Sequence, residues 1–205
     1  MSPRFVLGSG SPRRRHLLEE AGYEFEVVEP AIAELAVASF TIRELTICNA
    51  TRKALAIARS RPDAVVLGAD TLVALDGEVI GKPADLAHAQ EILRRLGGRS
   101  HEVRTAVFIC HLARGQAHSF QEVSRVQFRE LDRGAISKYL AKIDPLDKAG
   151  AYAAQGHGMD IIERIEGSYS NVVGLPMEET ARVLRLFGIK PSRTPNHSAT
   201  VALSR

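Results

Sequence analysis

The segment from residue 65 to residue 83 constrains the fold of this chain more than any other. Residues 65–67 are all apolar, a run that is typical of a β-strand buried on both faces. The strand is predicted to end at Gly68, and a single carboxylate, Asp70, follows it closely. The sequence therefore predicts a buried strand with an acidic side chain at its mouth.

The second half of this segment predicts a β-hairpin. Apolar residues 72–75 lead into Asp76-Gly77, a dipeptide that favours a two-residue hairpin turn. If the hairpin closes, it brings Lys82 back toward Asp70. A carboxylate and an ammonium group at the mouth of a buried strand suit a site for a metal and a phosphate. The alternative is an ordinary hairpin with two charged surface residues, and this segment alone favours that alternative.

The N-terminal segment predicts a possible anion site at the start of a helix. Residues 5–7 predict a short buried strand, and after a glycine-serine turn Ser11 caps a helix that begins at Pro12. Such a helix start offers backbone N–H groups and a positive dipole end to an anion. Arg13 and Arg14 oppose that dipole, so their position suggests a ligand such as a triphosphate. A solvated basic helix start explains the same pattern equally well.

Apolar periodicity predicts the remaining elements. Helices are expected over residues 41–59, 86–96, 131–143 and 176–187, and strands over residues 25–28, 103–109, 120–128 and 159–165. Residues 145–152 have no clear period and predict a structured loop. Lys53 lies beside the apolar stripe of its helix, where a lysine commonly reaches solvent, and Glu34 lies in a loop.

Length and composition allow a single large domain. The 205 residues can bury a substantial core, and 45% hydrophobic with 25% charged residues is ordinary for a soluble globular protein. The formal charge of +3 suits anionic small molecules as well as nucleic acid. A nucleic-acid binder built on residues 13–15 would need interleaved aromatic residues, and the 5% aromatic content argues against it.

The cysteines and the apolar runs predict a cytoplasmic protein. Cys48 and Cys110 lie in apolar or strand-like surroundings without metal spacing, so they are interpreted as reduced core thiols. No apolar run approaches the length that spans a membrane, and neither a membrane nor a nucleic acid is expected as a partner. Residues 1–189 are predicted to form one domain. Residues 190–205 are rich in proline and serine and predict a flexible tail.

Three groups of motifs together resemble the Maf family of nucleoside triphosphate pyrophosphatases. The first is Leu7-Gly8-Ser9-Gly10-Ser11-Pro12-Arg13-Arg14, and the second is Gly68-Ala69-Asp70-Thr71 with Gly81-Lys82-Pro83. The third is Asp147-Lys148-Ala149-Gly150-Ala151-Tyr152 with Gln155-Gly156, Gly167-Ser168-Tyr169 and Val172-Val173-Gly174-Leu175-Pro176. The resemblance covers about residues 4–188 in order, which makes chance agreement very improbable.

The resemblance implies an α/β fold of the inosine-triphosphatase-like kind, with a long twisted mixed sheet flanked by helices and two lobes around a cleft. It also implies hydrolysis of a nucleoside triphosphate to the monophosphate and pyrophosphate with Mg²⁺ or Mn²⁺, the divalent ions that oxygen ligands and phosphate chemistry favour. Asp70 is the implied catalytic carboxylate and, with Glu34, a metal ligand. The expected phosphate-binding residues are Ser9, Ser11, Arg13, Arg14, Lys53 and Lys82. A homodimer is a further expectation.

The resemblance also implies a substrate. Arg13, Thr71 and Gln155 coincide with positions that separate the dTTP/UTP branch of the family from its 7-methyl-GTP branch. The Thr71 hydroxyl and the Gln155 amide could match the carbonyl–N–H–carbonyl edge of uracil or thymine. We therefore expect dTTP and UTP as preferred substrates, with modified uridine triphosphates as further candidates. The alternatives are a 7-methyl-GTP pyrophosphatase and a non-catalytic nucleotide-binding regulator of septum formation and cell division.

Overall fold

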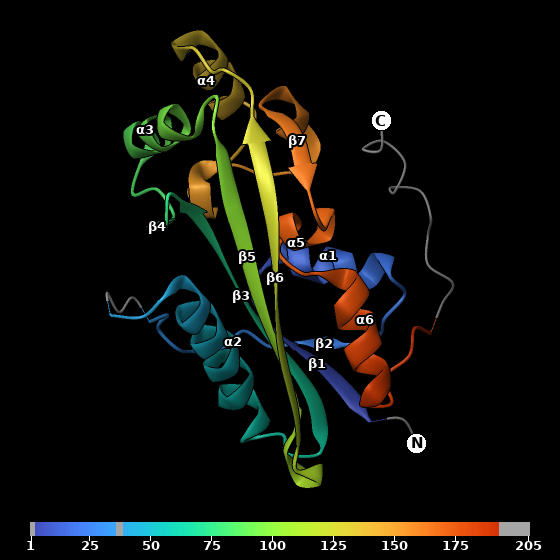
Figure 1. The fold of residues 1–205 in the computed structure, drawn as a ribbon. Coiled ribbons are helices and arrows are strands. Elements are labelled where there is room, and N and C mark those ends of the chain that lie inside the picture. Colours follow the sequence, from blue (N-terminus) through green and yellow to red (C-terminus); the bar gives the residue numbers. More distant parts are fainter. Residues whose placement is uncertain (1–2, 36–38, 193–205) are drawn as a thin grey trace.

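A seven-stranded mixed sheet forms the centre of the molecule (Figure 1). The computed structural model describes residues 3–35 and 39–192. The strand order is β2-β1-β3-β5-β6-β7, and β4 also pairs with β3. The strands are β1 (Arg4–Gly8), β2 (Glu26–Val27), β3 (Ala64–Leu75), β4 (Glu78–Ile80), β5 (Ser100–His111), β6 (Gln116–Phe128) and β7 (Ile162–Glu166). β1 is parallel to β2 and to β3, whereas the other pairs are antiparallel.

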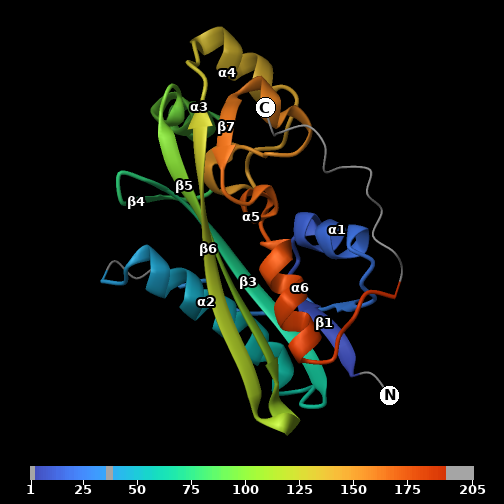
Figure 2. The ribbon, with the colours of Figure 1, turned by 45° about the vertical axis from the view of Figure 1, so that its right-hand side comes forward.

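Helices cover both faces of this sheet. α2 (Ile42–Ala58) packs on one face, and α1 (Pro12–Glu20), α5 (Tyr169–Val173) and α6 (Met177–Leu186) lie on the other (Figures 1 and 2). α3 (Leu86–Leu96) and α4 (Arg133–Leu140) pack together at one end, beside the 3₁₀ turn η2 (Ala149–Ala151). Two further 3₁₀ turns are η1 (Leu112–Arg114) and η3 (Gly156–Asp160). The expected α/β class, with a long mixed sheet flanked by helices, is confirmed. Within the described residues no helix has both the length and the apolar character needed to cross a membrane.

Two glycines let α2 lie close against the sheet. A Cβ atom on Gly68 would lie 2.4 Å from the carbonyl oxygen of Ala50 and 2.7 Å from the backbone nitrogen of Ala54. A Cβ atom on Gly8 would lie 2.9 Å from the end of the Ile57 side chain. Any side chain at Gly68 would therefore push α2 outward. The close approach brings polar residues of α2 within reach of the next residues of β3.

The predicted end of the central strand at Gly68 is wrong. β3 runs without interruption from Ala64 to Leu75, because β5 pairs with it throughout this region, including Asp70 opposite Ala106 and Thr71 opposite Thr105. The predicted hairpin is confirmed: Asp76 and Gly77 have φ values of 52° and 84°, and β4 pairs back onto β3.

One edge of β3 is open for four residues. β1 pairs with this edge over residues 64–68, and β4 pairs with it over residues 73–75. Among the described residues, no strand covers the same edge at residues 69–72. An uncovered edge exposes the side chains of both faces and backbone hydrogen-bonding groups to a ligand.

Several other predicted bounds are wrong by a few residues. The strand expected over residues 25–28 contains only the two residues of β2, and the helix expected over residues 131–143 ends at Leu140 as α4. The strand expected at residue 159 begins at Ile162, since η3 occupies the preceding residues. The five-residue helix α5 is not predicted by any apolar period. Most of the expected tail, residues 193–205, lies outside the described residues.

Candidate active site

A cavity of about 590 Å³ opens at the uncovered edge of β3. It is large enough for a small-molecule ligand. All of the residues that the sequence assigns to the site line it, namely Ser9, Ser11, Arg13, Arg14, Glu34, Lys53, Asp70, Thr71, Lys82 and Gln155. The structure thus brings together residues from α1, α2, β3 and four loops.

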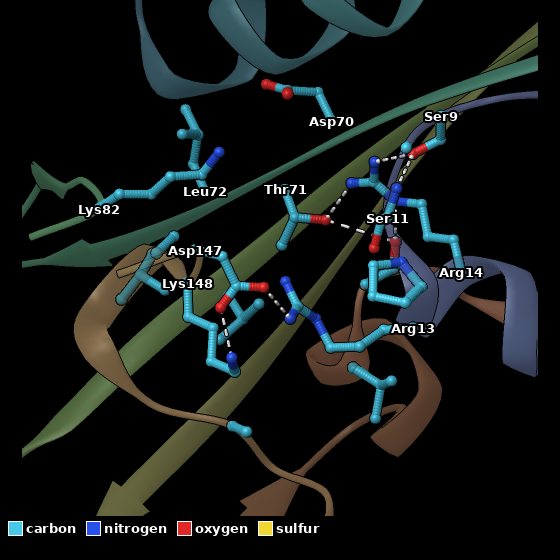
Figure 3. A pocket seen from close by; sticks show the side chains of 18 of the residues that line it. Ser9, Ser11, Arg13, Arg14, Asp70, Thr71, Leu72, Lys82, Asp147 and Lys148 are labelled. Atoms are coloured by element: carbon cyan, nitrogen blue, oxygen red, sulfur yellow. Dashed lines mark hydrogen bonds and ion pairs between the residues drawn. The ribbon is translucent and has the colours of Figure 1, made fainter. Parts of the chain in front are cut away.

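Asp70 and Thr71 enter this cavity from opposite faces of the sheet. Successive side chains of a strand alternate between faces, so Asp70 points toward α2 and Thr71 points away from it (Figure 3). Both line one cavity because the edge of β3 is open between them. A bound ligand can therefore contact both faces of the strand at this edge.

On the α2 face, two carboxylates share one lysine. The Lys53 ammonium lies 2.7 Å from Asp70 Oδ1 and 2.6 Å from Glu34 Oε1. Asp70 and Lys53 are buried, with 3% and 8% of their surface exposed, so this ion pair is poorly screened by water. Lys53 does not reach solvent, in contrast to the common behaviour of a lysine beside an apolar stripe. Partial burial alone would raise the pKa of Glu34, but the hydrogen bond and charge of Lys53, with the charges of Lys82 and Arg14, lower it below its usual value.

Asn49 contacts Asp70 but is not among the residues that the sequence predicts for the site. Its Nδ2 group lies 3.4 Å from Asp70 Oδ2 and 3.2 Å from the carbonyl oxygen of Leu35, and its Oδ1 accepts the Leu35 N–H at 2.8 Å. Asn49 thereby ties the loop that carries Glu34 to the carboxylate of Asp70. The sequence does contain one indication of this role: Asn49 lies four residues before Lys53, which places both side chains on one face of a helix.

On the other face, Arg14 is buried and bonded to three neutral acceptors. Its Nε donates to the Gly174 carbonyl at 2.8 Å, Nη1 donates to Ser9 Oγ at 3.1 Å, and Nη2 donates to Thr71 Oγ1 at 3.0 Å (Figure 3). Burial lowers the pKa of Arg14, although the negative charges of Asp70 and Glu34 partly offset that effect. None of these acceptors carries a charge, so the positive charge of Arg14 favours an anion in the cavity.

Ser9 and Ser11 form the turn before α1. Ser9 Oγ accepts the Ser11 N–H at 3.2 Å as well as the Arg14 donor, so its hydroxyl proton is left to donate to another group. Ser11 occupies the N-cap position, as expected, but its side chain makes no capping hydrogen bond. Both hydroxyls and the first N–H groups of α1 therefore suit an anion at this helix start.

Arg13 crosses the cavity to a charged loop. Its Nη1 lies 3.0 Å from Asp147 Oδ2, and Lys148 binds the other oxygen of Asp147. Partial burial raises the pKa of Asp147, but hydrogen bonds from Lys148 and Arg13 dominate and hold it below its usual value. Asp147 and Lys148 begin one of the family motifs, but the sequence alone predicts no role for them. An anion that binds Arg13 would compete with Asp147 for it.

Some polar side chains lining the cavity have no hydrogen-bond partner among the described residues. They include the Lys82 ammonium, which β4 and the following turn carry to the cavity, and the Gln155 amide just before η3. Tyr152 contributes part of the wall, and its hydroxyl lies 2.8 Å from Nε2 of the buried His101. Burial lowers the pKa of His101 to about 4, so the ring is neutral at pH 7.

A family model and sequence relatives indicate one family. The model of the Maf family, described as Maf-like protein, matches residues 4–187 of this chain. A relative from Bacillus cereus (strain ATCC 10987 / NRS 248), named dTTP/UTP pyrophosphatase, is 41% identical over 186 residues, which cover 91% of each chain. A relative from Pelotomaculum thermopropionicum with the same name is 43% identical over 183 residues, which cover 89% of this chain and 96% of that protein. The solved structure of the Staphylococcus aureus Ham1 protein superimposes with a TM-score of 0.44 and 15% identity, over 62% of this chain and 72% of that chain.

Proposed function

This chain belongs to the Maf-like family, and from that premise we propose that it hydrolyses dTTP and UTP to the nucleoside monophosphate and pyrophosphate. Relatives that are 41% and 43% identical over about nine-tenths of the chain are named dTTP/UTP pyrophosphatase. The proposal rests on one observation: Lys53 forms ion pairs with both Asp70 and Glu34 in a cavity that also contains the basic start of α1. A carboxylate base for the reacting water and cations for a triphosphate are thus in one place.

In the proposed reaction, Asp70 orients the attacking water. One water molecule attacks the α-phosphorus. The bond from the α-phosphorus to the oxygen that bridges the α- and β-phosphates breaks, and pyrophosphate leaves with that oxygen. Asp70 accepts a hydrogen bond from the water and receives its proton as the new bond forms. Lys53 holds the carboxylate of Asp70 in place, and Asn49 bonds to its second oxygen.

The proposed phosphate-binding groups are the two serines before α1 and four cations. Ser9 and Ser11 donate hydroxyl hydrogen bonds, while Arg13, Arg14, Lys53 and Lys82 neutralise the negative charge of the phosphates. A triphosphate bound here replaces Asp147 as the partner of Arg13. The cations also stabilise the charge that develops on the leaving pyrophosphate.

The donor set fits a divalent cation. Glu34 and Asp70 present oxygen atoms to a common point, which the Lys53 ammonium contacts in this structure. The described residues contain no group of three or more His, Cys, Asp or Glu side chains that could hold a metal alone. Two carboxylates completed by phosphate oxygens and water are typical of Mg²⁺ or Mn²⁺. When bound, the cation neutralises phosphate charge and favours attack on phosphorus.

A nucleotide panel tests this proposal. The protein is incubated with Mg²⁺ and UTP, dTTP, CTP, GTP or 7-methyl-GTP, and pyrophosphate and orthophosphate are measured separately. We expect pyrophosphate as the first product, the highest kcat/KM for UTP and dTTP, and no reaction after chelation. Preference for 7-methyl-GTP would assign the chain to the other branch. Binding of nucleotides without any hydrolysis would favour the regulator of cell division.

The assembly and the location of the protein belong to the same proposal. We infer a homodimer from the family resemblance alone, and a cytoplasmic location because the proposed substrates are free nucleotides. Sedimentation of the full chain tests the first inference, because a monomer at micromolar concentration would contradict it. Fractionation of cells that express the chain tests the second.

A further inference from the structure

A directed chain of hydrogen bonds runs from Arg14 into the protein interior. Arg14 Nη2 donates to Thr71 Oγ1 at 3.0 Å, and the Thr71 and Thr105 hydroxyl oxygens lie 2.9 Å apart. Thr105 Oγ1 lies 3.2 Å from the backbone carbonyl oxygen of Asn171. Thr71 and Thr105 are directly opposite each other on β3 and β5, so the sheet register itself brings the two hydroxyls together.

The distances favour one direction for this chain. A carbonyl oxygen only accepts, and the Asn171 carbonyl oxygen lies closer to Thr105 Oγ1 than the Gly174 carbonyl oxygen lies to Thr71 Oγ1, so we assign the single proton of Thr105 to Asn171. Thr105 then accepts from Thr71, which in turn accepts from Arg14. The order of donation is Arg14 to Thr71 to Thr105 to the Asn171 carbonyl. In this order the completely buried Thr105 hydroxyl has both a donor and an acceptor as partners.

The proton of the Thr71 hydroxyl is used within the protein. Besides Arg14 and Thr105, the Gly174 carbonyl oxygen lies 3.4 Å from Thr71 Oγ1. A hydroxyl has one proton and two lone pairs, so the proton serves Thr105 or Gly174 and one lone pair accepts from Arg14. The simplest role for Thr71 is therefore to hold Arg14, whereas donation to a nucleotide base would require the hydrogen bond to Thr105 to break.

We propose that Thr105 is a positioning residue for substrate binding, which fixes the Arg14 guanidinium through the hydroxyl of Thr71. The inference rests on the proposed function, in which Arg14 binds the phosphates. Arg14 has five N–H donors, and the described contacts use three of them. The remaining two can bind phosphate only while the other three keep the guanidinium plane in place. Thr105 itself does not line the cavity and contacts no substrate.

Two variants of Thr105 test the proposal. Thr105→Val removes the hydroxyl but keeps a β-branched side chain that suits a buried strand. We expect its affinity for inorganic triphosphate, measured by calorimetry, and its kcat/KM for UTP to fall about tenfold, the effect of one lost hydrogen bond. Thr105→Ser keeps the hydroxyl and should stay within about twofold of the unmodified protein. A Thr105→Ser defect as large as that of Thr105→Val would overturn the proposal.

Thr180→Val is the matched control. Thr180 is completely buried in α6, its hydroxyl has no partner among the described residues, and it does not line the cavity. The substitution removes the same group from an equally buried position. We expect unchanged triphosphate affinity and unchanged kcat/KM. Equal losses in Thr180→Val and Thr105→Val would mean that Thr105 acts only through stability.

A double-variant cycle tests the route through Thr71. If both hydroxyls act on Arg14 in series, adding Thr105→Val to Thr71→Val should lower triphosphate affinity by less than about twofold. If the losses of triphosphate affinity in the two single variants multiply in the double variant, the proposal is overturned. It is also overturned if the unmodified protein does not bind triphosphate. If that protein binds triphosphate but hydrolyses no nucleotide, the proposed function fails, while calorimetry still decides the role of Thr105.

Discussion

Asp70 and Thr71 are consecutive residues of β3, yet they serve two separate groups of side chains on opposite faces of the sheet (Figure 3). Asp70 contacts Lys53 and Asn49 from α2, whereas Thr71 contacts Arg14 from α1. The open edge of β3 joins the two groups in one cavity. Variants on the α2 face should therefore act mainly on the chemical step, and variants on the α1 face mainly on phosphate binding.

The first prediction concerns the carboxylate of Asp70. Asp70→Asn keeps the size of the side chain but removes the charge that orients water, so kcat for UTP should fall by at least about a hundredfold. Pyrophosphate release under saturating UTP and Mg²⁺ measures the loss. Asp160→Asn, a change of the same kind in an exposed ion pair with Lys142, should leave kcat unchanged. Full activity of Asp70→Asn would exclude the proposed mechanism.

A second prediction concerns Asn49. Asn49→Ala removes the two bonds to the backbone of Leu35 and the contact with Asp70, so the loop bearing Glu34 is held less firmly. We expect kcat to fall about tenfold and the Mg²⁺ concentration for half-maximal activity to rise, because Glu34 is a proposed metal ligand. Thermal unfolding separates this effect from a general loss of fold. An unchanged Mg²⁺ requirement would remove Glu34 from the metal site.

Local patterns predicted most of the fold. The Asp76-Gly77 turn, the buried apolar strands and the longer helices depend on neighbouring residues and are found near their expected positions. The structure shows N-caps on three of these helices, at Thr41, Asp85 and Asp132. The continuity of β3 through Gly68 was not predictable in this way. It depends on pairing with β5, in which Phe108 lies opposite Gly68, and on the close approach of α2.

The positions of the site residues were predicted by motifs, but their contacts were not. The motif resemblance pointed to Asp70, Lys53 and Glu34, which the fold brings together. No local pattern distinguishes the buried Arg14 from the exposed Arg15 beside it, because the difference arises from packing against Gly174. Thr105 could not be found from sequence at all, since its role depends on strand register.

A third prediction links acid stability to His101. The pKa of this buried imidazole is lowered from 6.5 to about 4, so the unfolded chain binds a proton in this pH range that the folded protein does not. The stabilising effect of a neutral His101 is complete above pH 6.5 and is lost as pH falls toward 4. The shift of the pKa from 6.5 to about 4 corresponds to a loss of about 3 kcal/mol of unfolding free energy on acidification.

Urea denaturation of the unmodified protein and of His101→Gln between pH 7 and pH 4 measures this loss. The glutamine side chain does not titrate, so the unfolding free energy of the variant should fall less on acidification. Protonated His101 carries an N–H donor on both ring nitrogens, and the described residues offer Nδ1 no partner. Parallel pH curves for the two proteins would show that His101 stays neutral or is not buried.

The last prediction concerns selection of the base by Gln155. Its amide lines the cavity, and among the described residues it has no hydrogen-bond partner. An amide can donate to a uracil carbonyl and accept from the uracil N–H. Gln155→Glu keeps the acceptor but loses the donor, and its carboxylate can accept from the amino group of cytosine. The ratio of kcat/KM for UTP to that for CTP should therefore fall at least about tenfold.

Gln116→Glu, the same change at an exposed position at the start of β6, should leave the ratio unchanged. Because added charge weakens phosphate binding for both nucleotides alike, an equal loss for UTP and CTP would mean that Gln155 lies near the phosphates and does not read the base.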